Sequence, residues 1–266
     1  MPVPLHDAHN HLAHHWLSEV LSNFLSTTGI VGIKHSIVNA THTEEWAAVL
    51  EFCAAYPNAV PAIGLHPWYV DDAPADWQSP FVKAFDNGAQ VVGEIGLDRS
   101  NARPTLDKQM PAFEFQLEFA AQNNLPVSIH AVNATGALLD SLRSKNLPAR
   151  GFHLHAYAGP LELVDELVAL GSHFSFNSSQ LQHPKVAETI IAIPGDRLFL
   201  ETDAPFRLPP AALQEFSFEA PFKHLNHPAN LKQTYQAVAN IRKLDVVNLA
   251  QRIDANFRRF FLTQSD

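Results

Sequence analysis

Eight short apolar segments, separated by longer segments with helical periodicity, most constrain how this chain folds. They are rich in Val, Ile, Phe or Leu, and most are too short for helices, which is typical of strands buried on both faces. The eight segments are Leu5–His11, Gly32–Val38, Val60–His66, Val91–Glu94, Val127–His130, Gly151–His155, His173–Asn177 and Leu198–Asp203. Strands that alternate with helices pair in parallel through right-handed crossovers.

The intervening segments place apolar residues on one side of a helix. Helices are predicted for Glu44–Tyr56, Lys108–Asn123, Leu161–Leu170, Pro184–Ile193, Leu231–Leu244 and Asp245–Leu262. An open doubly wound sheet and a closed barrel both satisfy this alternation, but eight strands within 266 residues favour the barrel. We therefore predict a single α/β domain, a (β/α)8 TIM-like barrel, over residues 1–266.

Composition narrows the class of protein. Hydrophobic residues make up 46 % of the chain and charged residues 17 %, which supplies a large core and excludes a disordered chain. The formal charge of -9 excludes a protein that holds nucleic acid or membranes through a broad basic face. The single cysteine, Cys53, excludes a disulfide framework and a cysteine-rich zinc site. No apolar segment reaches the length of a membrane span, so we expect a cytoplasmic protein without membrane contact.

Polar residues gather at the ends of the predicted strands. They are His9, His11, His66, Glu94, His130, His155 and Asp203. In a barrel the carboxyl ends of the strands converge on the face that carries the active site. Imidazole and carboxylate groups suit zinc, manganese or a related divalent ion. The sequence therefore predicts a divalent metal site on that face.

Two of these elements carry most of the metal prediction. His9 and His11 lie two apart in an extended segment, so both side chains reach the same side and one ion. A His-x-His pattern alone is weak, but here it follows Asp7 in the first predicted strand. Glu94 lies in an apolar segment, where its charge needs a partner. That partner is either a cation, which its two oxygens would allow it to share with a second cation, or an arginine in a buried ion pair.

The remaining candidate metal ligands lie at the ends of later predicted strands. His130 ends one segment and Asp203 ends the last. His153 and His155 form a second His-x-His pair, in which both share a face. His155 lies nearer the carboxyl end, so we expect His155 to be the ligand and His153 to be a buried neighbour with a partner.

Together these segments resemble the TatD family of metal-dependent hydrolases, a branch of the amidohydrolase-like barrels. The resemblance spans most of the chain, and its sequence blocks follow one another in the same order as in the family. The matching blocks are Asp7–Leu12, Gly64–Pro67, Gly93–Asp98, Leu125–His130, His155–Gly159, Glu201–Phe206 and Pro228–Leu231.

The resemblance implies a TIM-like barrel with two divalent ions, Zn, Mg or Mn. One ion would be held by His9, His11, Glu94 and Asp203, and the other by Glu94, His130 and His155. Asp203 would orient or deprotonate the attacking water, so Asp203 and Glu94 are the expected catalytic residues. His66, from the Gly-x-His-Pro block, would contact substrate rather than metal.

Two arginines lie on loops that follow matched blocks. Arg99 and Arg207 either contact an anionic substrate or pair with nearby carboxylates. The chain also departs from the family at positions where arginine is common. Ala131–Asn133 stands in place of a Ser-Arg pair, and Lys223–Leu225 in place of an Arg-Gly-Lys run. Because arginine holds phosphate bidentately, these losses bear on substrate binding more than on the reaction type.

Three functions follow from the sequence. The first is a metal-dependent phosphodiesterase, similar to the family's DNases, acting on DNA or a small phosphodiester as a monomer. The second is an amidohydrolase-type enzyme for a small amide, ester or lactone, with the same ions polarising a carbonyl. The third is a non-catalytic barrel with structural metal, which has no need of an open cluster built from several strand ends. We expect the first.

Overall fold

The computed structural model describes residues 4–20, 32–100 and 104–262. All eight predicted strands are present, and they form one sheet in the order β1 to β8. The strands are β1 (Leu5–Asn10), β2 (Ile33–Asn39), β3 (Ala59–Ile63), β4 (Val91–Asp98), β5 (Val127–Val132), β6 (Phe152–Leu154), β7 (Ser172–Phe176) and β8 (Leu198–Leu200). Consecutive order with helices between the strands is the topology of a (β/α)8 barrel.

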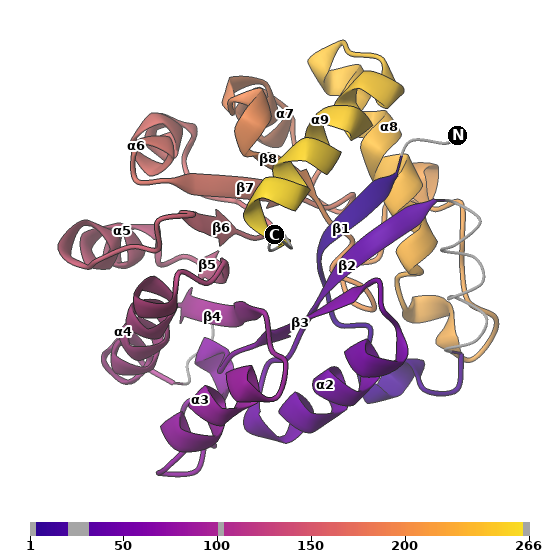
Figure 1. The fold of residues 1–266 in the computed structure, drawn as a ribbon. Helices are drawn as coiled ribbons and strands as arrows, with labels where there is room; N and C mark the ends of the chain where they lie inside the picture. The colour runs from indigo at the N-terminus through magenta and orange to yellow at the C-terminus, as the bar shows by residue number, and fades with distance from the viewer. Residues whose placement is uncertain (1–3, 21–31, 101–103, 263–266) are drawn as a thin grey trace. The chain divides into compact units, whose positions relative to one another are not determined.

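Helices α2 to α7 lie between consecutive strands from β2 to β8, and α8 and α9 follow β8 (Figure 1). They are α2 (Trp46–Ala55), α3 (Gln78–Asp86), α4 (Leu106–Asn123), α5 (Thr135–Ser144), α6 (Val164–Ala169), α7 (Pro184–Ala192), α8 (Leu231–Arg242) and α9 (Val246–Phe260). The six predicted helices are confirmed with shifted ends. α3 and α5 were not predicted from the sequence. Pro80 lies in the first turn of α3, where a missing N–H costs no helical hydrogen bond.

The chain divides into two compact units. The first unit comprises residues 1–37 and 174–266, and the second comprises residues 38–173. The single domain predicted over residues 1–266 stays a prediction.

In the first unit, α9 packs on β1 and β8 (Figure 1). Asp245 caps this helix by accepting hydrogen bonds from the N–H groups of Val247 and Asn248. Apolar residues three or four apart then form one buried stripe, Leu249, Ile253, Phe257 and Phe260. The stripe holds β1 in place, and β1 carries His9.

In the second unit, β3, β4, β5 and β6 pair in parallel, and every residue of β4 is buried. The carboxyl ends of all eight predicted strands are shifted, and three of them, in β3, β4 and β8, are wrong by three or more residues. β4 runs on to Asp98, so Glu94 lies inside the strand, where the pairing with β5 shifts register between Val92 and Ile95. β3 ends at Ile63 and β8 ends at Leu200, so His66 and Asp203 lie in the loops that follow.

Within the described ranges, no helix combines the length and the apolar content needed for a membrane crossing.

Candidate metal centre

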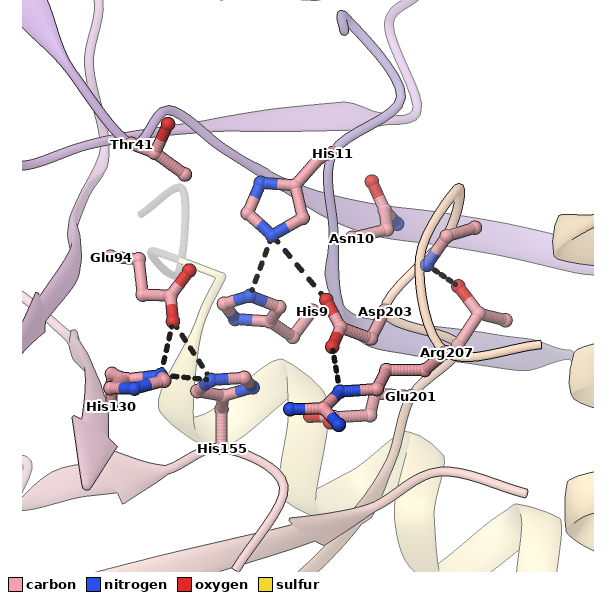
Figure 2. A network of polar contacts seen from close by, with 12 residues as sticks. His9, Asn10, His11, Thr41, Glu94, His130, His155, Glu201, Asp203 and Arg207 are labelled. Carbon is pink, nitrogen blue, oxygen red and sulfur yellow. Dashed lines mark hydrogen bonds and ion pairs between the residues drawn. The ribbon is translucent and has the colours of Figure 1, made fainter. Parts of the chain in front are cut away.

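The first unit brings together three of the predicted residues, His9, His11 and Asp203 (Figure 2). The Nε2 atoms of His9 and His11 lie 3.3 Å apart. Nε2 of His11 lies 3.4 Å from Oδ1 of Asp203. All three side chains are buried. Two imidazoles and a carboxylate therefore point at one another from the carboxyl end of β1, from the residue that follows it and from the loop after β8.

Backbone hydrogen bonds fix this first cluster. The N–H of Asp203 donates to the carbonyl of His9 at 3.0 Å, and the N–H of His11 donates to the carbonyl of Ala204 at 2.7 Å. Asp203 has a φ of 54°, in the left-handed region, which Asp tolerates better than most residues. The bonds on both sides hold this conformation, so the carboxylate stays beside His11.

Two carboxyl groups that sequence reasoning had not assigned support the loop that carries Asp203. Asp7 accepts hydrogen bonds from the N–H of Thr202 at 2.9 Å and from its hydroxyl at 2.5 Å. Burial raises the pKa of Asp7 to about 7, although the bonds from Thr202 act to lower it. Glu201 is buried and accepts bonds from Ser175 and from Asn177, the latter at 3.2 Å. Both belong to matched blocks, but only the fold shows what they contact.

The second unit brings together Glu94, His130, His155 and His66. Oε1 of Glu94 lies 2.9 Å from Nδ1 of His130 and 2.8 Å from Nε2 of His155 (Figure 2). The same oxygen lies 3.5 Å from Nε2 of His66. All four side chains are buried. One carboxylate oxygen thus faces three imidazoles.

Asp98 is the residue of this cluster that sequence reasoning missed. Its Oδ2 atom lies 2.8 Å from Nε2 of His130 and accepts a hydrogen bond of 2.8 Å from the indole N–H of Trp68. Its Oδ1 atom accepts from the N–H and the hydroxyl of Ser100. The signal in the sequence was the carboxylate at the end of the Gly93–Asp98 block, four residues after Glu94 on the same face of the strand.

Burial and hydrogen bonding shift the protonation of these groups in different directions. Burial opposes charge on His130, but the bonds to Asp98 and Glu94 outweigh it and raise its pKa. Burial acts to raise the pKa of Asp98, yet the bonds from His130 and Ser100 hold it well below its usual range. Burial lowers the pKa of His66 to about 4, against the opposing effect of Glu94, so His66 is neutral at pH 7.

Two buried glutamines of α4 hold the backbone on which this cluster is built. Gln109 accepts from the N–H of Asp98 and donates to its carbonyl, both at 2.8 Å. Gln116 accepts from the N–H of Leu65 at 2.7 Å and donates to its carbonyl at 3.2 Å. The segments that carry His66 and Asp98 are therefore attached to the same helix.

Close backbone approach around Glu94 requires glycine. Gly96 has a φ of +144°, and a Cβ there would lie 2.0 Å from the carbonyl oxygen of His130. A Cβ at Gly64 would lie 2.8 Å from the carbonyl oxygen of Glu94. These glycines let the neighbouring strands bring Glu94 and His130 together.

The other residues singled out in the sequence differ in burial and in the groups that they contact. The predicted partner of His153 is confirmed, because its Nδ1 lies 3.3 Å from the hydroxyl of Ser128. Arg207 is 59 % exposed, and its Nε lies 3.6 Å from Oδ2 of Asp203, so it pairs with a carboxylate (Figure 2). Arg99 is exposed, and its N–H donates to the carbonyl of Val132. His66 faces Glu94 from a buried position, so its predicted contact with substrate stays a prediction.

The donors of both clusters fit a divalent cation. In the first, His9, His11 and Asp203 each offer one nitrogen or oxygen within 4.8 Å of the others. In the second, His66, Glu94 and His130 do the same. Buried imidazole and carboxylate donors without sulfur suit zinc or a harder divalent ion. Within each cluster, a cation bound by these donors would offset the cost of burying the carboxylate.

Known proteins match this chain over nearly its full length. A family model described as TatD related DNase matches residues 6–262. A 3'-5' ssDNA/RNA exonuclease TatD from Cronobacter sakazakii is 32 % identical over 241 residues, covering 87 % of this chain and 88 % of the relative. An uncharacterized metal-dependent hydrolase, YabD from Bacillus subtilis, is 26 % identical over 264 residues, covering 97 % of this chain and 98 % of the relative.

A solved structure shares the fold. The TatD homologue YjjV from Escherichia coli superposes with a TM-score of 0.89 at 25 % identity, covering 99 % of this chain and 100 % of that one. The predicted (β/α)8 fold class is confirmed by this likeness and by the strand order.

Proposed function

We propose, from the premise that this chain belongs to the TatD related DNase family, that it hydrolyses phosphodiester bonds in single-stranded nucleic acid with the help of divalent ions. Membership makes it a hydrolase, and the relative from Cronobacter sakazakii supports the choice of substrate. The observation that carries the proposal is the Oε1 atom of Glu94, which lies within 3 Å of ring nitrogens of both His130 and His155. Such a buried oxygen between two imidazoles is suited to a shared cation.

Two ions are proposed, as the sequence predicts. His9, His11, Asp203 and Glu94 would hold one, and Glu94, His130 and His155 would hold the other. The support within each unit is the convergence of the donors and the neutrality of His66 beside them. When bound, such ions lower the pKa of a coordinated water and neutralise charge that develops on phosphoryl oxygens.

The protein side chains supply orientation and proton transfer. Asp203 is proposed to accept the proton of the attacking water, because its carboxylate is buried beside His11 and held by backbone bonds. Arg207 is an exposed cation beside Asp203, and we assign it to a phosphate oxygen of the substrate. Asp98 holds His130 through its Nε2 atom, which directs Nδ1 toward Glu94.

A cytoplasmic location and a nucleic-acid partner complete the proposal. Cys53 is buried and is the only cysteine, which supports a reducing compartment such as the cytoplasm. DNA or another single-stranded nucleic acid is the proposed partner, and the enzyme is proposed to act as a monomer.

A substrate panel tests this function. The protein is dialysed against a chelator, returned to Mg²⁺, Mn²⁺ or Zn²⁺, and assayed with a labelled single-stranded oligonucleotide, a chromogenic phosphodiester and a chromogenic ester. We expect both phosphodiesters to be cleaved after a divalent ion is restored, and not before. Turnover of the ester without either phosphodiester would contradict the proposal and favour the amidohydrolase alternative. Metal binding without any turnover would favour a structural site.

A further inference from the structure

An exposed aromatic surface lies beside the His9–His11–Asp203 cluster, within the first unit. Trp16 is 45 % exposed, and it follows His14 and His15, which are partly or largely exposed. Aromatic residues, Trp among them, are enriched in the parts of a protein surface that bind partners. Nothing in the proposed chemistry uses these rings.

The rings form a continuous series from the cluster to the surface. The ring centroids of His11 and Phe206 lie 5.3 Å apart, and those of Phe206 and Trp16 lie 5.7 Å apart, both edge-on. The ring of His14 contacts the last two of these rings, with centroids 5.4 Å from Phe206 and 4.7 Å from Trp16. These separations are typical of favourable aromatic pairs, so each ring supports the next.

Backbone hydrogen bonds fix the position of this surface relative to the cluster. The N–H of His14 donates to the carbonyl of His11 at 2.9 Å. The N–H of Trp16 donates to Nδ1 of His14 at 3.3 Å, which caps the short 3-10 turn His15–Leu17. The exposed indole is therefore attached through one turn of chain to a proposed metal ligand.

A cation adjoins the same surface. Arg207 directly follows Phe206, is 59 % exposed, and lies beside Asp203. An aromatic face next to a guanidinium matches the two ends of a nucleotide, a flat base and an anionic phosphate. Stacking tolerates any sequence, because every base has a π-face.

We propose that His14, Trp16 and Phe206 form a stacking platform for an unpaired nucleobase of the nucleic acid whose phosphodiester is cleaved. This inference rests on the proposed function. It gives the enzyme a means of holding single strands without the broad basic face that its charge of -9 excludes. It also favours single strands over duplexes, since a base within a duplex is already stacked and paired.

Binding to two matched probes tests the platform. One probe is a labelled single-stranded oligothymidylate of about ten nucleotides, within the usual size of a single-strand site. The other has the same backbone with abasic residues. Affinities are measured by fluorescence anisotropy in chelator, so no cleavage occurs and no metal is needed. The wild-type protein should bind the base-bearing probe about tenfold more tightly.

Variants assign that preference to the platform. Trp16→Ala should abolish the preference for bases, and Trp16→Phe should keep most of it. Ile191→Ala, at a 62 % exposed position on α7, is the control and should change nothing. Equal binding of the two probes by the wild-type protein, no measurable binding of either, or a full preference in Trp16→Ala would overturn the proposal.

Three further outcomes separate the platform from its alternatives. If the wild-type protein cleaves no phosphodiester but Trp16→Ala loses the base preference, the proposed function fails and the platform stands. If cleavage occurs and the preference survives in Trp16→Ala, the function stands and the platform fails. A Trp16→Ala variant that keeps the preference but changes a dimer into a monomer in light scattering would show a self-association surface instead.

Discussion

Nε2 of His130 lies 2.8 Å from Oδ2 of Asp98, so a carboxylate at the end of β4 orients an imidazole on β5. The other ring nitrogen of His130 lies 2.9 Å from Glu94. The pair resembles the carboxylate–histidine arrangement that fixes the tautomer and the basicity of a metal-binding imidazole. Asp98 is therefore a positioning residue rather than a proposed ligand.

Asp98→Asn should weaken divalent-metal binding by about 10- to 100-fold with the fold retained, because the charge behind His130 is lost. Competition with a metal-chelating dye measures this affinity without any assay of turnover. Ser100→Ala is the control, since it removes only a hydroxyl that bonds to the opposite oxygen of Asp98. Unchanged metal affinity in Asp98→Asn would contradict the positioning role.

The eight strands were predictable because a strand buried on both faces leaves an uninterrupted apolar segment, as in Val91 and Val92. The ends of the strands were less predictable. Gly and Asp are depleted in strands, so Gly96 and Asp98 gave no sign that β4 continues past Glu94. α5 begins at Thr135 and has Gly136 in its first turn, which weakened its helical signal. The resemblance supplied the candidate site residues, but the pairing of Asp98 with His130 depends on the register of two strands.

Gly96→Ala should destabilise the protein by about 3 kcal/mol or more, because the new methyl group would meet the carbonyl oxygen of His130 in a backbone conformation that disfavours side chains. Gly136→Ala is the matched control. A Cβ there meets nothing within 4 Å, and the residue lies in α5, so stability should rise by about 0.5–1 kcal/mol. Chemical denaturation measures both. Equal stability of the two variants would show that β4 and β5 do not need this close approach.

His6 gives the stability a defined pH dependence. It is fully buried, and Nε2 lies 2.7 Å from Oδ1 of Asp254. Burial lowers its pKa from 6.5 to about 4, despite the opposing effect of Asp254. The unfolded chain thus binds a proton more readily than the folded one. The contribution is fully present above pH 6.5 and is lost as the pH falls toward 4, by about 3 kcal/mol.

The difference between the wild-type protein and His6→Gln isolates this effect, because buried Asp7, with its pKa raised to about 7, contributes a dependence of opposite sign to both proteins. We expect the stability advantage of the wild-type protein over the variant to shrink between pH 6.5 and pH 4 in urea titrations. A difference that stays constant over this range would show that His6 has an ordinary pKa in the folded state.

Cleavage of a single-stranded oligonucleotide by metal-restored protein, compared with Glu94→Gln and Asp203→Asn, tests the central claim most directly. Glu114→Gln is the matched control, since it removes a carboxylate that pairs with Lys145 on the surface. Both cluster variants should lose about a thousandfold or more in rate while folding normally, because each lacks a carboxylate proposed to hold an ion. Glu114→Gln should keep the wild-type rate. A wild-type rate in either cluster variant, or cleavage that persists in chelator, would contradict the account.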